Sequence, residues 1–87
     1  MGYEILLHPS VARYLVKLGK DAPRDAQRCA KALRGLSRDP FTGRPGVDIA
    51  PWQGPEFEYR LRVGRHRFGY RVDKKRRIVY IDAAWFK

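Results

Sequence analysis

The sequence is poor in cysteine, in acidic residues and in long apolar runs. Its 87 residues include one cysteine, Cys29, so no disulfide framework can form within the chain, and this usage suits a reducing cytosol. No stretch approaches the roughly 20 apolar residues that a membrane-spanning helix needs. The first residues also lack the basic start and apolar run of a signal peptide. We therefore expect a cytoplasmic protein without a membrane partner.

The common catalytic and metal-binding motifs are missing too. The chain has no G-x-x-x-x-G-K-[ST], G-x-S-x-G or H-E-x-x-H pattern, so no motif in the sequence indicates nucleotide hydrolysis or the usual hydrolase chemistries. Cys29, His8 and His66 do not have the spacing of a zinc site. The sequence thus predicts no metal and no small-molecule cofactor, and any catalysis has to depend on arginines.

Cationic side chains, in contrast, are abundant. Lys and Arg number 19 against nine Asp and Glu, a formal net charge of +10. Such a charge favours an acidic partner, whether nucleic acid, the ribosome or an acidic protein. We expect a single domain over residues 1–87 with one core, because a domain of this size buries only about 60 to 65% of its unfolded surface.

The most regular pattern lies in residues 57–72, where apolar residues alternate with charged ones. A period of two is typical of half-buried strands, and Gly64-Arg65 predicts a two-residue turn with glycine first. This turn sets the register of a hairpin whose apolar residues share one face. The register pairs Phe57 with Val72, Tyr59 with Tyr70, Leu61 with Phe68, Val63 with His66 and, as opposite charges, Glu58 with Arg71.

The other face of this hairpin carries arginines. Arg62 and Arg67 are directly opposed in the predicted register, and Arg60 lies one pleat away across from Gly69. Directly opposed like charges destabilise a strand pair, so the cluster suggests a missing anion. In so basic a chain the face can also be an ordinary solvated surface. We favour phosphate recognition, because arginine is suited to planar contacts and Gly69 is expected to leave the surface open.

The remaining pattern predicts a small α+β fold. Its order is β-α-α-β-β-β, with two N-terminal helices packed on one face of an antiparallel-rich sheet and the arginines on the open face. Residues 39–56 are rich in Pro and Gly and predict an irregular connector. The expected elements are a strand at 3–7, a helix from 9 to about 18 stopped by Gly19, a second helix that starts at Asp21 or Ala22 with Pro23 and reaches Leu36, strands at 59–63 and 66–72, and a strand at 78–81 buried on both faces.

Three further residues have structural interpretations that we prefer. Cys29 falls on the apolar side of the second predicted helix and is expected to be a core residue rather than a nucleophile. His8 is expected to cap the first helix or to lie on the surface. Trp52 is expected to pin the connector on the core, with stacking on a nucleic-acid base as the alternative.

Two segments of the chain are similar to one known family. Tyr59-Arg60-Leu61-Arg62-Val63-Gly64, followed by Arg67-Phe68-Gly69-Tyr70, resembles the YRxRxG-x-x-R-x-x-Y strand pair of the RelE/ParE superfamily of toxins from bacterial and archaeal toxin-antitoxin pairs. His8-Pro9-Ser10-Val11 to Leu18-Gly19 resembles the first helix of that family. The order of the predicted elements agrees with the family over the whole chain.

The resemblance implies a toxin with one of two activities. RelE-like members cut messenger RNA in the ribosomal decoding site, whereas ParE-like members inhibit DNA gyrase. Our leading expectation is a ribosome-dependent, metal-independent messenger RNA endonuclease, and a non-catalytic basic nucleic-acid-binding protein is a third possibility. A cognate acidic antitoxin is the expected protein partner. The resemblance implies catalytic positions at Arg60, Arg62 and Arg67, and we expect Arg65, Arg71 and Lys87 to hold flanking RNA or ribosomal RNA.

The chemistry of such a nuclease also needs proton transfer. Arginines stabilise charge but stay protonated, so they are poor general bases. Several RelE-like members carry lysine at two of these positions and a tyrosine or histidine beyond the last strand, which this chain lacks. Tyr70, Tyr80 and His66 remain as candidates, although the predicted register turns Tyr70 and His66 toward the core. Whether the protein is an enzyme stays open at this point.

Overall fold

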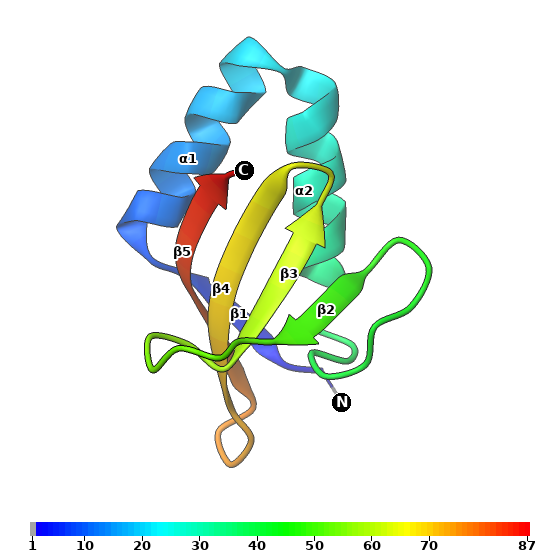
Figure 1. Ribbon diagram of the computed structural model, residues 1–87, viewed down its shortest axis with the longest axis vertical. Helices are drawn as coiled ribbons and strands as arrows, with labels where there is room; N and C mark the ends of the chain where they lie inside the picture. The colour runs from blue at the N-terminus through cyan, green and yellow to red at the C-terminus, as the bar shows by residue number, and fades with distance from the viewer. Residues whose placement is uncertain (1) are drawn as a thin grey trace.

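The chain folds into a five-stranded mixed sheet with two helices on one face (Figure 1). The structure is a computed structural model that describes residues 2–87. The strand order is β1-β5-β4-β3-β2, in which β1 pairs parallel with β5 and the other neighbours are antiparallel. The predicted α+β class and the placement of the helices are confirmed. The elements are β1 (Glu4–Leu7), α1 (Pro9–Asp21), α2 (Pro23–Gly35), β2 (Asp48–Pro51), β3 (Tyr59–Val63), β4 (His66–Asp73) and β5 (Ile78–Phe86).

The ends of α1 follow from its flanking residues. His8 Nδ1 accepts a hydrogen bond from the Ser10 amide at 3.1 Å, so the predicted cap is confirmed. The predicted stop at Gly19 is wrong, because the helix continues to Asp21. Pro23 explains the actual end, since a proline disfavours helical geometry in the residue before it, and Ala22 is extended at φ −147°.

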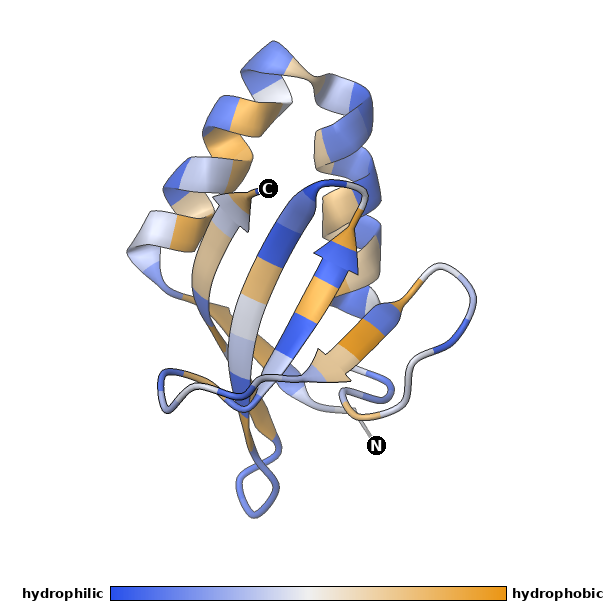
Figure 2. Cartoon of the chain, viewed as in Figure 1, coloured by the Kyte–Doolittle hydropathy of each residue, from blue (hydrophilic) through white to orange (hydrophobic). Residues whose placement is uncertain are grey.

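The core lies between the helices and the sheet. Val11 of α1 and Cys29 and Leu33 of α2 pack with Leu61, Phe68 and other apolar side chains of the inner sheet face. Cys29 is 0% exposed, which confirms it as a core residue. Figure 2 shows the complementary pattern, with hydrophilic bands on the outer surfaces of the helices and alternating bands along β3.

The hairpin forms in the predicted register. Val63 pairs with His66, Leu61 with Phe68 and Tyr59 with Tyr70, while Arg62 opposes Arg67 and Arg60 opposes Gly69. Gly64 has a φ of +60°, as a two-residue turn with glycine first requires. The turn chemistry and the alternation together therefore determine which side chains face the helices.

Two details of the predicted hairpin are wrong. Arg71 forms its ion pair with Asp82, whose Oδ2 is 2.6 Å from Arg71 Nε, while the Glu58 carboxylate accepts a hydrogen bond from the Val72 amide at 2.8 Å. The register of β4 and β5 shifts between Gly69 and Tyr70, and Asp82 lies at this bulge, between the partners of those two residues. The sequence register of β3 and β4 alone could not show a partner supplied by β5.

Phe57 is the second departure, since it lies before β3 and covers Gly69 instead of pairing with Val72. Gly69 therefore does not open the arginine face. Trp52 and Trp85 join Phe57 there, with ring centroids 5.1 Å from Trp52 to Phe57 and 5.5 Å from Trp52 to Trp85. Trp52 thus pins the connector, as predicted, but on the open face of the sheet rather than in the core.

The connector itself contains a strand that the sequence pattern did not predict. β2 pairs antiparallel with β3, Asp48 opposite Arg62 and Pro51 opposite Tyr59, and forms one edge of the sheet. Proline is tolerated at an edge because one side of that backbone has no strand to bond with. The last strand is also longer than expected, reaching Phe86, and Tyr80 is only partly buried on the arginine face, so burial on both faces was wrong at that position.

Gly69→Ala tests the packing of Phe57. A Cβ at this position would overlap the Phe57 ring, so we expect the free energy of unfolding to fall by about 1–3 kcal/mol. Gly19→Ala is the matched control, because its Cβ meets nothing within 4 Å in the last turns of α1, and it should stabilise by up to about 1 kcal/mol. Urea denaturation followed by tryptophan fluorescence measures both, and an unchanged Gly69→Ala midpoint would contradict the packing.

Cys29 gives a second test of the core. Burial raises the pKa of its thiol to about 11, so at pH 8 roughly one thiol in a thousand is ionised, and that thiol is inaccessible. We expect Ellman's reagent to label the native protein no faster than the protein unfolds, and to label it at once in guanidinium chloride. Rapid labelling of the native protein would instead make Cys29 a reactive surface thiol.

Candidate nucleic-acid interface

The three arginines expected to be catalytic do share the open face of the sheet. Arg60 and Arg62 come from β3 and Arg67 from β4, and the register places Arg62 directly against Arg67. β2 adds a carboxylate to the same face. Asp48 Oδ1 is 3.7 Å from Arg60 Nη1, and Asp48 Oδ2 is 3.5 Å from Arg62 Nε. The cluster therefore carries its own partial counter-charge.

Arg60 and Arg62 differ in their access to solvent. The Arg60 side chain is only 21% exposed, and its Nη1 atom is buried without a hydrogen-bond partner. A buried donor of this kind is costly unless something else satisfies it, and Asp48 supplies only a long ionic contact. Arg62 is 53% exposed. Arg62 can therefore reach a ligand directly, whereas Arg60 is placed to hold Asp48.

Arg67 lies next to the β3–β4 turn. Its Nη1 donates a hydrogen bond to the Gly64 carbonyl at 2.8 Å, which fixes the guanidinium over the β3–β4 turn. Trp85 lies opposite Arg67 in the pairing of β4 with β5. Arg67 makes no ion pair with any residue in the described range 2–87. Its charge is consequently available to an anion beside Arg62.

The three residues expected to hold flanking RNA do not gather in one place. Arg65 Nε donates to the Lys87 carbonyl at 2.7 Å, and its guanidinium lies 5.0 Å from the Phe86 ring centre. Arg71 lies four residues beyond Arg67, about 13 Å along β4. The hydrogen bond to Asp82 raises the pKa of Arg71. Arg65 and Arg71 are exposed, but each guanidinium already has a hydrogen-bond partner within the chain.

Two of the proton-transfer candidates face the helices, as the register predicted. The Tyr70 hydroxyl is fully buried and donates to the Pro40 carbonyl at 2.7 Å, and burial raises its pKa. His66 is 5% exposed. Its Nδ1 is 2.7 Å from the Tyr14 hydroxyl and its Nε2 is 3.2 Å from Asp25 Oδ2, so it joins the hairpin to α1 and α2. Neither side chain is presented on the arginine face.

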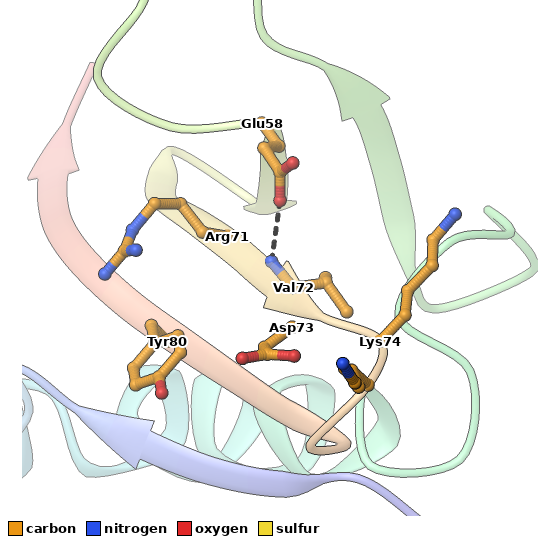
Figure 3. Close-up of a pocket in the computed structure, with 7 residues that line it drawn as sticks. Glu58, Arg71, Val72, Asp73, Lys74 and Tyr80 are labelled. Atoms are coloured by element: carbon orange, nitrogen blue, oxygen red, sulfur yellow. Dashed lines mark hydrogen bonds between the residues drawn. The ribbon is translucent and has the colours of Figure 1, made fainter.

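The third candidate, Tyr80, lies on the open side but away from the hairpin turn. It lines an open pocket with Glu58, Arg71 and Lys74, shown in Figure 3. Arg71 extends over the Tyr80 ring at 4.8 Å from its centre, and Lys74 points away from both. Tyr80 therefore accompanies Arg71, not Arg62 and Arg67.

Within residues 2–87, Asp48 is the one carboxylate that pairs with any of the three arginines, and it contacts Arg60 and Arg62 but not Arg67. The sequence pattern missed it because β2 was read as irregular connector. Trp85 was missed as well, because the last strand was expected to stop at Ile81. The sequence did contain a signal for β2, a short alternation that is interrupted by proline. Its two sides are Asp48, Ala50 and Trp52 on one and Val47, Ile49 and Pro51 on the other.

Between residues 2 and 87, no three His, Cys, Asp or Glu side chains converge as metal ligands would. None of the helices in this range is long and apolar enough to cross a membrane.

Comparisons with known proteins agree with this architecture. The family described as ParE toxin of type II toxin-antitoxin system, parDE, matches residues 5–83. A comparison with curated sequences finds no match.

Three solved structures are similar over nearly their whole length. The toxin-antitoxin complex RelBE2 from Mycobacterium tuberculosis contains a chain 23% identical, with full coverage of both chains and a TM-score of 0.77. A chain of the archaeal RelE-RelB complex from Pyrococcus horikoshii is 25% identical, with 99% of this chain and 96% of that chain covered and a TM-score of 0.78. The YoeB/ParE toxin from Agrobacterium tumefaciens is 20% identical, with coverages of 97% and 98% and a TM-score of 0.78.

Asp48→Asn tests whether this carboxylate screens the arginines. The change removes the counter-charge between Arg60 and Arg62, so we expect stronger retention on heparin and a loss of about 1 kcal/mol in unfolding free energy. Asp21→Asn is the control, because it changes net charge equally but breaks an exposed ion pair with Lys17 on α1. Equal salt concentrations for elution of the two variants would show that Asp48 contributes net charge alone.

Proposed function

The chain belongs to the ParE toxin family of type II toxin-antitoxin systems, within the RelE/ParE superfamily, and from this we propose that it is a RelE-like toxin that cleaves messenger RNA on the ribosome. The face formed by Arg60, Arg62 and Arg67 is the proposed RNA site. Ribosomes and messenger RNA place this activity in the cytoplasm.

The observation that carries the proposal is the direct opposition of Arg62 and Arg67. Both side chains lie on the open face, and Arg62 is about half exposed. Each guanidinium offers several N–H donors in a plane, which suits the oxygens of one phosphate. When the RNA 2′-hydroxyl attacks its neighbouring phosphate, extra negative charge develops on the phosphate oxygens. Two fixed cations at that position would therefore stabilise the transition state more than the ground state.

Proton transfer needs two further groups. One accepts the proton of the 2′-hydroxyl and one protonates the departing 5′-oxygen. Asp48, 3.5 Å from Arg62, is the carboxylate best placed to be the acceptor. In this proposal the proton donor is supplied by the RNA or by the ribosome.

A cognate antitoxin is part of the same proposal. Two of the similar structures are toxin-antitoxin complexes. The net charge of +10 favours an acidic partner, and a segment that folds on binding could cover the arginines and block the RNA site.

A ParE-like inhibitor of DNA gyrase is the second candidate. The matching family is the ParE one, and Asp48 stands without a second proton-transfer group beside the arginines of the described chain. A toxin that acts by binding needs no such pair. The same arginines would then contact gyrase or its DNA.

Arg62→Ala and Arg67→Ala separate these functions. We expect each to lower ribosome-dependent cleavage by on the order of 10²-fold or more, because each removes a cation from the developing charge. Primer extension on a messenger RNA, with and without programmed ribosomes, measures the cuts. Arg13→Ala, an exposed arginine of α1, removes the same charge elsewhere and should cleave normally.

Circular dichroism and urea denaturation must show that both variants are folded. Cleavage that persists in folded Arg62→Ala and Arg67→Ala would refute the proposed site. If the wild-type protein makes no cuts but inhibits supercoiling by purified gyrase, the ParE-like function replaces the RelE-like one.

A further inference from the structure

A basic groove runs beside the arginine face, between α2 and the edge of the sheet. α2 forms one wall, and the turn before β2 with the end of β3 forms the other. We call it the α2 groove. Its charged lining consists of Arg28, Lys31, Arg38, Arg44, Arg62 and a single carboxylate, Asp48.

The helix wall is built by sequence spacing. Arg28, Lys31 and Gly35 are separated by three and four residues and so share one side of α2. From Arg28 to Gly35 the wall is about 10 Å long at the usual helical rise. Arg44 closes the far end, where its Nη2 donates to the Gly35 carbonyl at 2.8 Å and its Nη1 donates to the Thr42 carbonyl at 2.8 Å. Arg44 is thus held at the end of the groove by backbone carbonyls rather than by a carboxylate.

Its cations are largely uncompensated. Lys31 and Arg38 are exposed and have no carboxylate within 4.0 Å among residues 2–87. Arg28 has only a long contact with Asp25 at 3.9 Å and is 65% exposed. Asp48 is already shared between two arginines. A cleft lined by one sign of charge concentrates the field and attracts a polyanion.

Arg62 connects the groove to the proposed RNA site. It lines the groove and also opposes Arg67 on the arginine face. We infer that the α2 groove binds the sugar-phosphate backbone of RNA that flanks the nucleotide held by Arg62 and Arg67. The inference deepens the proposed function and rests on it. It also replaces the expected flanking role of Arg65 and Arg71, neither of which lines the groove.

The lining favours nucleic acid over an acidic peptide. Peptide docking usually depends on a large apolar or aromatic anchor in a deep pocket. The apolar part of this groove consists of small side chains such as Ala32, Val47 and Val63. Phosphate contacts need no such pocket, because long cationic side chains reach the backbone from the rim.

The test compares binding of fluorescein-labelled oligouridine of four and twelve nucleotides by anisotropy. We expect wild-type protein to bind the 12-mer more tightly, and the double variant Lys31→Ala/Arg38→Ala to lose that advantage while keeping 4-mer affinity. The slope of log affinity against log salt for the 12-mer should become shallower by about 1.4, since each single-strand phosphate contact contributes roughly 0.7. Arg13→Ala/Lys20→Ala, with the same loss of charge on α1, should keep the wild-type slope.

Three results would overturn the inference. The first is unchanged 12-mer binding by the folded Lys31→Ala/Arg38→Ala protein, and the second is an equal loss in the α1 control, which would mean that net charge alone decides. The third is that Lys31→Ala/Arg38→Ala loses binding to a labelled 12-residue polyglutamate peptide but keeps RNA binding, which would make the groove a site for an acidic protein. Cleavage is measured separately with Arg62→Ala, so failure of the nuclease and failure of the groove are distinguishable.

Discussion

The β3–β4 turn is the constraint on which the rest of the structure depends. Gly64 takes a positive φ that side-chain-bearing residues rarely adopt, and this lets the strands reverse in two residues. A shift of one residue would exchange the two faces and bury the arginines. Because the register holds, Leu61 and Phe68 meet the helices while Arg62 and Arg67 meet solvent. The core and the arginine face therefore come from the same hairpin.

The arginine face is organised by contacts within the protein. Asp48 lies between Arg60 and Arg62, Arg67 is tied to the turn, and Asp82 holds Arg71. Fixed side chains lose little freedom when a ligand binds, which favours binding. The hairpin, with its turn, carries five arginines. The same contacts separate those that are available to a ligand from those that maintain the fold. Exposure and partners, rather than residue type, make this division.

Much of the fold was predictable because its signals are local. Alternation in residues 59–72, Gly64 at the turn and Pro9 and Pro23 at helix starts all act within a few residues. β2 was not predictable in this way, because a four-residue strand is stabilised by its partner β3 and not by its own propensity. Asp48 shows the consequence for the site, since its position on the arginine face exists only through that pairing.

By itself, the sequence determined the hairpin register, the two helices, the excess of positive charge and the resemblance to a toxin superfamily, because each depends on neighbouring residues or on composition. Only the tertiary structure decided that Phe57 covers Gly69, that Arg71 pairs with Asp82 rather than with Glu58, and that Lys31 of α2 lines the same groove as Arg62. These are contacts between residues far apart in the chain. Packing in three dimensions selects them, and no local pattern encodes which distant partner prevails.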